Sequence, residues 1–136
     1  MIEKQIIKLM LDKNFYTEYK GQVSRNVFQG SFGSLYDTIQ KAHEKYDADI
    51  SIDELYSLHT TVFNPALTRA AKEQFSELLE DIKETQEPSK EIADDIVKIL
   101  SERDVAQRIA VEATEIFNGK PADFNAITSM IEKYKT

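Results

Sequence analysis

Apolar side chains recur along most of this chain at intervals of three or four residues, the spacing of one helix face. The first stretch aligns Ile2, Ile6, Leu9 and Met10 in this way, and sustained alternation of apolar and polar residues, the mark of a strand, is not found. The pattern predicts an all-α fold. Helices are expected over residues 2–12, 15–23, 34–46, 51–61, 64–85, 89–118 and 122–135.

Polar residues at the starts of these segments fix several helix boundaries. Ser51 and Glu54 have the spacing of a capping box, and Ile50 with Leu55 forms the matching hydrophobic staple. The helix that follows is therefore the most clearly marked in the chain.

Glycine and proline predict two further boundaries. A loop is expected over 27–33, because Gly30 and Gly33 bracket Ser31 and Phe32, with Ser34 as the N-cap of the next helix. Asn64 and Pro65 have the form of an N-cap followed by proline at the first helical position. Both turns separate amphipathic segments.

The segment 89–118 contains neither glycine nor proline, and Gly119 is placed to end it. Its helix would be about 45 Å long, whereas a domain of this size is about 35 to 40 Å across. One end should therefore extend beyond the globular part. We expect a single domain, 1–136, in which a small globular helical bundle, the head at 1–87, is followed by a projecting helical hairpin at 88–136.

The long segment carries one stripe with alternating steps of four and three, the period of a coiled-coil seam. Its members are Ile92, Ile96, Ile99, Arg103, Ala106, Ala110, Ala113 and Phe117. We expect Phe124, Ile127 and Ile131 of the last helix to cover one side only, leaving the other for a second chain. The predicted self-association residues are Arg103, Ala106, Ala110, Ala113, Ile116, Phe117, Phe124, Ile127 and Ile131.

Arg103 interrupts the apolar stripe, and two interpretations stay open. A polar seam residue can specify register or partner. Alternatively, Arg103 binds Glu102 or Asp104 at the surface.

Composition narrows the functional classes. A formal charge of −7 disfavours direct binding of DNA or RNA and favours protein partners. The chain has no cysteine, which excludes disulfides and thiolate sites and fits a cytoplasmic location. No window has the 18 or more apolar residues of a membrane span, and no signal peptide is evident, so no membrane association is expected.

Candidate chemistry is sparse. His43 and His59 are interpreted as helix residues at the edge of the core, without the spacing of a metal site. The carboxylates lie on polar helix faces, and the segment 30–34 has the wrong spacing for a phosphate loop. We therefore expect no catalytic, cofactor-binding or metal-ligating residue, and no enzyme activity in this chain.

Several strings, in their order and spacing, resemble the N-terminal domain of DnaB-like replicative DNA helicases, particularly the diverged bacteriophage members. The resemblance covers almost the whole chain. Lys8 departs from the family pattern, which commonly has glycine there. The strings are Ile6-Ile7-Lys8-Leu9-Met10-Leu11-Asp12 followed by Phe15; Val27-Phe28; Leu35-Tyr36 with Ile39; Ile50-Ser51-Ile52-Asp53-Glu54-Leu55; and Glu102-Arg103 with Arg108, before Ala110, Ala113 and Ile116.

The resemblance implies a non-catalytic collar domain that pairs through its hairpin, forms a trimer of dimers and receives primase or a helicase loader. ATP and Mg²⁺ would belong to a motor domain beyond a linker, in the cytoplasm of the bacterial host. Two alternatives remain: a stand-alone helical adaptor or regulatory protein, and an enzyme with a site built from scattered carboxylates and tyrosines.

Overall fold

The computed structural model describes residues 2–135, with side chains through Tyr134, and within that range it contains helices and no strand. The all-α prediction is confirmed. The α-helices are α1 (Ile2–Met10), α2 (Lys13–Tyr19), α3 (Ser31–Lys45), α4 (Ile52–Ser57), α5 (Arg69–Glu84), α6 (Lys90–Phe117) and α7 (Phe124–Lys135). A 3-10 turn, η1 (Arg25–Val27), precedes α3, and a π-helical segment, η2 (Leu58–Phe63), continues α4.

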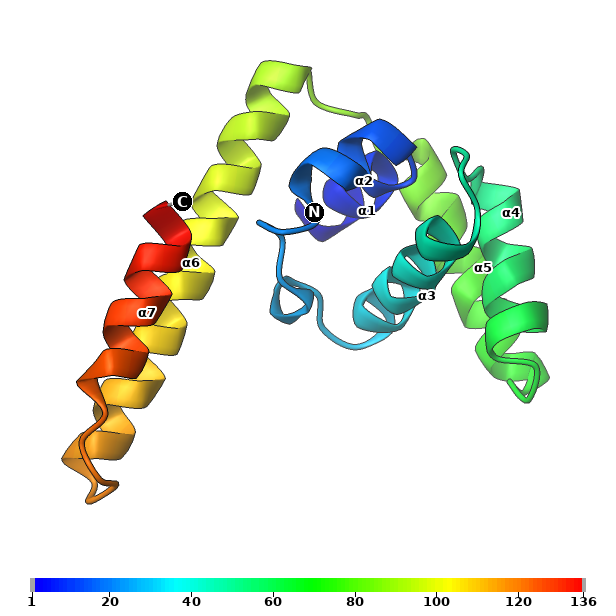
Figure 1. Cartoon of the computed structure of the whole chain (residues 1–136). Helices are drawn as coiled ribbons and strands as arrows, with labels where there is room; N and C mark the ends of the chain where they lie inside the picture. Colours follow the sequence, from blue (N-terminus) through cyan, green and yellow to red (C-terminus); the bar gives the residue numbers. More distant parts are fainter. Residues whose placement is uncertain (1, 136) are drawn as a thin grey trace.

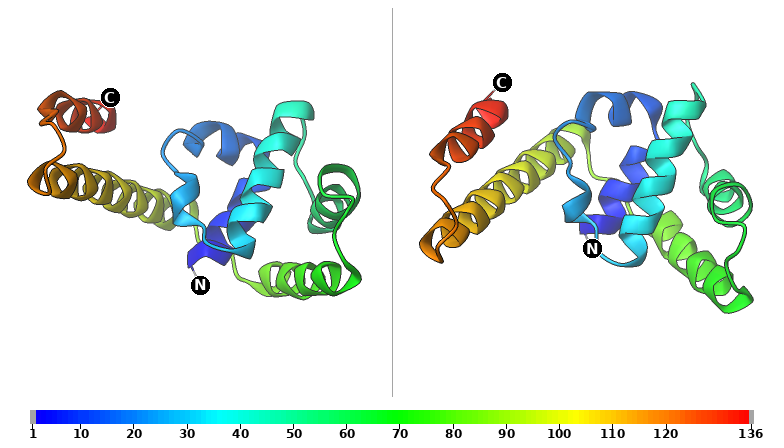
Figure 2. Two further views of the ribbon diagram at one scale, coloured as in Figure 1. Left: turned by 90° about the horizontal axis from the view of Figure 1, so that it is seen from below. Right: turned by 60° about the horizontal axis from the view of Figure 1, so that its bottom comes forward.

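Helix α1 lies at the centre of the head, where it packs against α2, α3 and α5 (Figure 1). Helix α5 also contacts α4, and α3 contacts η2. Helices α6 and α7 lie side by side on the opposite side of the molecule from α4 and α5 in all three views (Figures 1 and 2).

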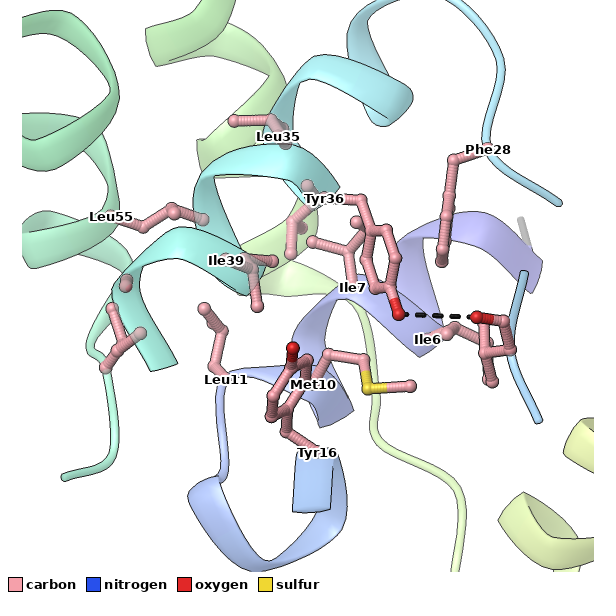
Figure 3. Close-up of a cluster of buried hydrophobic side chains, with 14 of the residues drawn as sticks. Ile6, Ile7, Met10, Leu11, Tyr16, Phe28, Leu35, Tyr36, Ile39 and Leu55 are labelled. Atoms are coloured by element: carbon pink, nitrogen blue, oxygen red, sulfur yellow. Dashed lines mark hydrogen bonds between the residues drawn. The ribbon is translucent and has the colours of Figure 1, made fainter. Parts of the chain in front are cut away.

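The core of the head forms where α1, α2 and α3 meet (Figure 3). Tyr36 and Phe28 are its largest fully buried side chains, and their rings stack with centroids 4.5 Å apart. The Tyr36 hydroxyl donates a 3.4 Å hydrogen bond to the Val23 carbonyl. Other members with no exposed surface are Ile6, Ile7, Met10, Leu35, Ile39, Ala42, Leu55, Ile82 and Val97.

The predicted capping box at the start of α4 is confirmed. The Glu54 amide donates to the Ser51 hydroxyl at 3.1 Å, and the Ser51 amide donates to the Glu54 carboxylate at 2.9 Å. Ile50 and Leu55 are both buried, as a staple requires. These hydrogen bonds also lower the pKa of the Glu54 carboxyl below its ordinary value.

The predicted loop over 27–33 is wrong in its second half, because α3 begins at Ser31 and not after Ser34. Gly30 takes the N-cap position with a φ of 58°, a conformation that glycine adopts at little cost. Gly33 is buried in the first turn, where the Arg25 guanidinium would lie 3.0 Å from a Cβ atom. Gly33, which was expected in a turn, therefore lies inside α3 and leaves space for the Arg25 side chain.

The predicted helix start at Asn64 and Pro65 is also wrong. Helix α5 begins at Arg69, with the Thr68 hydroxyl accepting from the Ala71 amide at 3.1 Å. The Asn64 side chain instead donates to the His59 carbonyl at 2.9 Å and so ends η2. Pro65 lies in the turn between the two helices.

Two lysines tie the C-terminal ends of helices to the start of the chain. The Lys8 ammonium donates to the carbonyls of Lys83 and Thr85, at 2.9 and 2.6 Å, where α5 ends. The Lys13 ammonium donates to the His43 carbonyl near the end of α3. Each lysine satisfies carbonyls that have no partner within their own helix.

Helix α6 is unbroken over 28 residues, about 42 Å, and the Ser89 hydroxyl caps its start by accepting from the Ile92 amide at 3.4 Å. Ala93 and Val97 are fully buried against the head, whereas α7 packs along the later part of the helix. Gly119, with a φ of 109°, follows the end of α6 as predicted.

Within the described residues, no helix combines the length and the apolar character that a membrane span requires.

Candidate interaction surface on the long helix

Two of the faces of α6 are occupied within the chain. The first turns present Ala93 and Val97 to the head. A second face lies toward α7, because the Tyr134 hydroxyl donates to the Glu102 carboxylate at 2.9 Å. On this face Val105, Ile109 and Ile116 are half-buried.

The remaining outer face of α6 is the predicted seam. Apart from Ile96, which packs against the core of the head, it is covered neither by the head nor by α7. Ile92 is 54% exposed, Ile99 is 45% exposed and Phe117 is 89% exposed. The members that lie in the open are Ile92, Ile99, Arg103, Ala106, Ala110, Ala113 and Phe117, and Ile96 is half-buried at the edge.

The structure divides the predicted self-association residues into three groups, of which the third, the exposed Phe124 and Ile131, belongs to α7. Arg103, Ala106, Ala110, Ala113 and Phe117 lie exposed on the outer face of α6. By contrast, the second group, Ile116 and Ile127, is half-buried and therefore already partly used between α6 and α7.

The predicted packing of α7 is partly wrong. Phe124 is 65% exposed and Ile131 is 39% exposed, so neither is the main cover of α6. The half-buried residues of α7 are instead Ala126, Ile127 and Met130. Phe124 is the first residue of α7 and thus lies at the open end of the helix pair, which leaves it free to extend the apolar surface.

Arg103 does not bind its neighbours. Asp104 pairs with Arg108 at 2.9 Å, and Glu102 accepts from Tyr134. Arg103 makes no ion pair with a described residue, and lies beside an apolar depression of about 230 Å³ on α6. The expected pairing of Arg103 with Glu102 or Asp104 is therefore not found.

Sequence reasoning missed the contribution of Ile2 to this surface. Ile2 was assigned to the core stripe of the first helix, but it is 39% exposed and lines the same depression as Ile92 and Ile99. The first residue of a helix can stay exposed although the residues that share its face are buried. No local sequence pattern indicates which of the two occurs.

The two histidines lie inside the head rather than at its edge, where they were predicted, and both are only 2% exposed. The His43 ring stacks on Tyr16, and its Nε2 donates to the Met10 carbonyl at 2.6 Å. The His59 Nδ1 accepts from the Thr38 hydroxyl at 2.7 Å and from the Asn64 amide at 3.2 Å. Each histidine joins segments far apart in the chain.

Burial lowers the pKa of both histidines below the ordinary value of 6.5. For His43, the hydrogen bond to the Met10 carbonyl and the nearby Asp49 and Asp12 oppose that shift, whereas Lys13 adds to it. For His59, Lys41 adds to the effect of burial. Protonation of either ring would also place a proton on a nitrogen that has no acceptor nearby. The His43 Nδ1 has no hydrogen-bond partner, and the His59 Nδ1 only accepts hydrogen bonds.

Stability of the head is therefore expected to fall as the pH falls below about 6.5. The unfolded chain binds protons at the ordinary histidine pKa, whereas the folded chain resists them, so the stabilisation is present above 6.5 and is lost below it. Urea denaturation followed by circular dichroism between pH 8 and 5 should show this fall, and His59→Gln should reduce its slope. A free energy of unfolding that stays constant or rises toward pH 5 would contradict the assignment of neutral, buried rings.

Among the described side chains, no group of three or more histidine, aspartate or glutamate residues is arranged to hold a metal ion. Comparison of the chain with protein-family models, with curated proteins and with solved structures finds no match in any of the three.

Proposed function

We propose that this chain is a non-catalytic interaction domain that self-associates through the outer face of α6. One observation carries the proposal. A helix of 28 residues presents a largely apolar stripe from Ile92 to Phe117, interrupted by Arg103, that the head covers only at Ile96 and that α7 leaves open. Apolar stripes of this kind on soluble domains usually mark protein contacts.

The occupant that fits this face best is a second copy of the same face. The stripe has the alternating four and three steps of a coiled-coil seam, which is complementary to itself. Ala106, Ala110 and Ala113 let two helix backbones approach closely. A two-fold pairing places the same residues on both sides and is the commonest arrangement in homo-oligomers.

The finer proposal is that the domain is the collar of a DnaB-like replicative DNA helicase, most similar to bacteriophage members. The ordered strings that resemble this family support it, together with an all-α fold and a long, continuous α6. In this role, pairs of the domain would assemble as a trimer of dimers and dock primase or a loader. The chemistry of ATP and Mg²⁺ would belong to a separate motor domain in the bacterial cytoplasm.

The reading frame of the parent gene tests the finer proposal. A strand followed by Gly-x-x-x-x-Gly-Lys-Ser/Thr downstream of Thr136 is expected, because a helicase needs a phosphate-binding loop. A stop codon directly after Thr136 would contradict the collar and favour a stand-alone helical adaptor. That outcome would leave self-association through α6 to be decided by its own measurement.

A further inference from the structure

A second recessed surface lies on the opposite side of α6 from the apolar stripe. It is a cleft of about 880 Å³ between the end of α2 with the following segment 20–25, on one wall, and α6 with α7 on the other. Arg108 of α6 crosses toward the head and donates to the Ser24 hydroxyl at 3.0 Å. Neither the self-association residues nor the histidines line this cleft.

The charge of the cleft is opposite to that of the chain. Two carboxylates, Glu18 and Asp104, are outnumbered by five cationic side chains, which gives the lining a formal charge of +3 in a chain of −7. The cationic residues are Lys20, Arg25, Lys98, Arg108 and Lys133.

Internal ion pairs engage two of these five cations. Arg25 pairs with Asp37 at 3.0 Å, and Arg108 pairs with Asp104 at 2.9 Å. Glu18 pairs with Lys90 at 3.9 Å, outside the cleft. Lys98 forms no ion pair with any residue that the structure describes.

From this cleft we propose that the domain binds an acidic peptide segment of a partner protein. The cations are spread over the segment 20–25, α6 and α7, so they suit an extended ligand with several carboxylates rather than one small anion. Ser24, Ser101, Gln22 and Gln40 supply further hydrogen-bonding groups along the walls. Charge complementarity of this kind sets partner choice and the rate of association.

A peptide fits the cleft better than a nucleic acid. A polynucleotide would run past the cleft onto the acidic remainder of the chain, which repels phosphates. Single-stranded nucleic acids also require aromatic platforms for their bases. Tyr134 is the aromatic residue of the lining, and its hydroxyl is held by Glu102.

Fluorescence anisotropy with a labelled octapeptide of alternating glutamate and serine tests the proposal on the whole chain. Binding is expected at low salt and should weaken as salt is added. Lys98→Gln, which removes a charge without breaking an ion pair, should weaken binding about threefold, and Lys98→Gln with Arg108→Gln about tenfold. Lys83→Gln, on the exposed surface of α5, is the matched control and should bind as the wild type does.

The result separates the possible occupants. Equal binding of the glutamine-serine octapeptide would overturn the proposal, because recognition would not depend on charge. Tighter binding of an oligothymidylate of equal charge would identify a nucleic-acid site instead. Unchanged affinity in Lys98→Gln, with circular dichroism showing an intact fold, would also overturn it. The Phe117→Asp variant should keep full peptide affinity, so failure of the cleft and failure of the α6 surface are distinguishable.

Discussion

Replacing Phe28 with alanine is expected to destabilise the head by about 3 to 5 kcal/mol, the range for a buried phenylalanine. Phe28 is 1% exposed, and its ring stacks on Tyr36 with centroids 4.5 Å apart. Its removal leaves a cavity beside α1 and α3 that the surrounding helices can close only in part. Because a whole domain is stable by about 5 to 15 kcal/mol, this change should lower the urea midpoint strongly.

The same substitution at Phe117 is the matched control. Phe117 is 89% exposed, so Phe117→Ala should change the stability of the monomer by less than about 0.5 kcal/mol. Both variants are measured by urea denaturation followed by circular dichroism, at a protein concentration low enough to keep the chain monomeric. Equal losses of stability at Phe28 and Phe117 would show that the two phenylalanines are not core and surface residues.

Phe117→Asp, and separately Ala113→Arg, are expected to separate the associated copies while leaving the chain folded. Each places a charge within the proposed apolar helix contact, at a cost of at least about 2 kcal/mol if it is desolvated. The dimer dissociation constant should therefore rise roughly 30-fold or more. Sedimentation velocity measures that shift, and circular dichroism shows that helicity is retained.

Val111→Asp provides the control for this surface. Val111 is on the same helix and 52% exposed, but it does not belong to the stripe of Ala106, Ala110 and Ala113. Its substitution should leave the dissociation constant unchanged. A loss of helicity in Phe117→Asp and Ala113→Arg would contradict the proposal that the outer face of α6 is the self-association surface. An equal loss of association in Val111→Asp would also contradict it.

The helix pattern was predictable because it is a local property of the sequence. The capping box at Ser51 and the stop at Gly119 involve residues only a few positions apart, and both are found. The two wrong boundaries depend on contacts that cross the fold. The Asn64 side chain donates to the His59 carbonyl and does not cap α5. The Arg25 guanidinium lies close to Gly33, where a larger residue would have its Cβ atom.

The candidate surface was predictable only in part. Periodicity assigned Ala106, Ala110 and Phe117 to one face of α6, and the structure leaves that face open. Periodicity does not tell which of several apolar faces a neighbouring helix will cover. For that reason the packing of Phe124 and Ile131 was wrong, and Ile2 was not assigned to the surface.

The cleft could not be predicted, because its walls come from segments more than 70 positions apart. Ser24 and Arg108 are joined across it by a single hydrogen bond. The cationic residues are scattered along an acidic chain and show no clustering in the sequence. Only the folded arrangement brings them together on one recessed surface.

The mass of the wild-type chain in solution tests the central proposal most directly. Light scattering across a concentration series should give a mass that rises from 15.6 kDa toward twice that value at tens of micromolar, because the outer face of α6 pairs with a second copy. A mass that remains at 15.6 kDa over the whole series would contradict self-association through this helix.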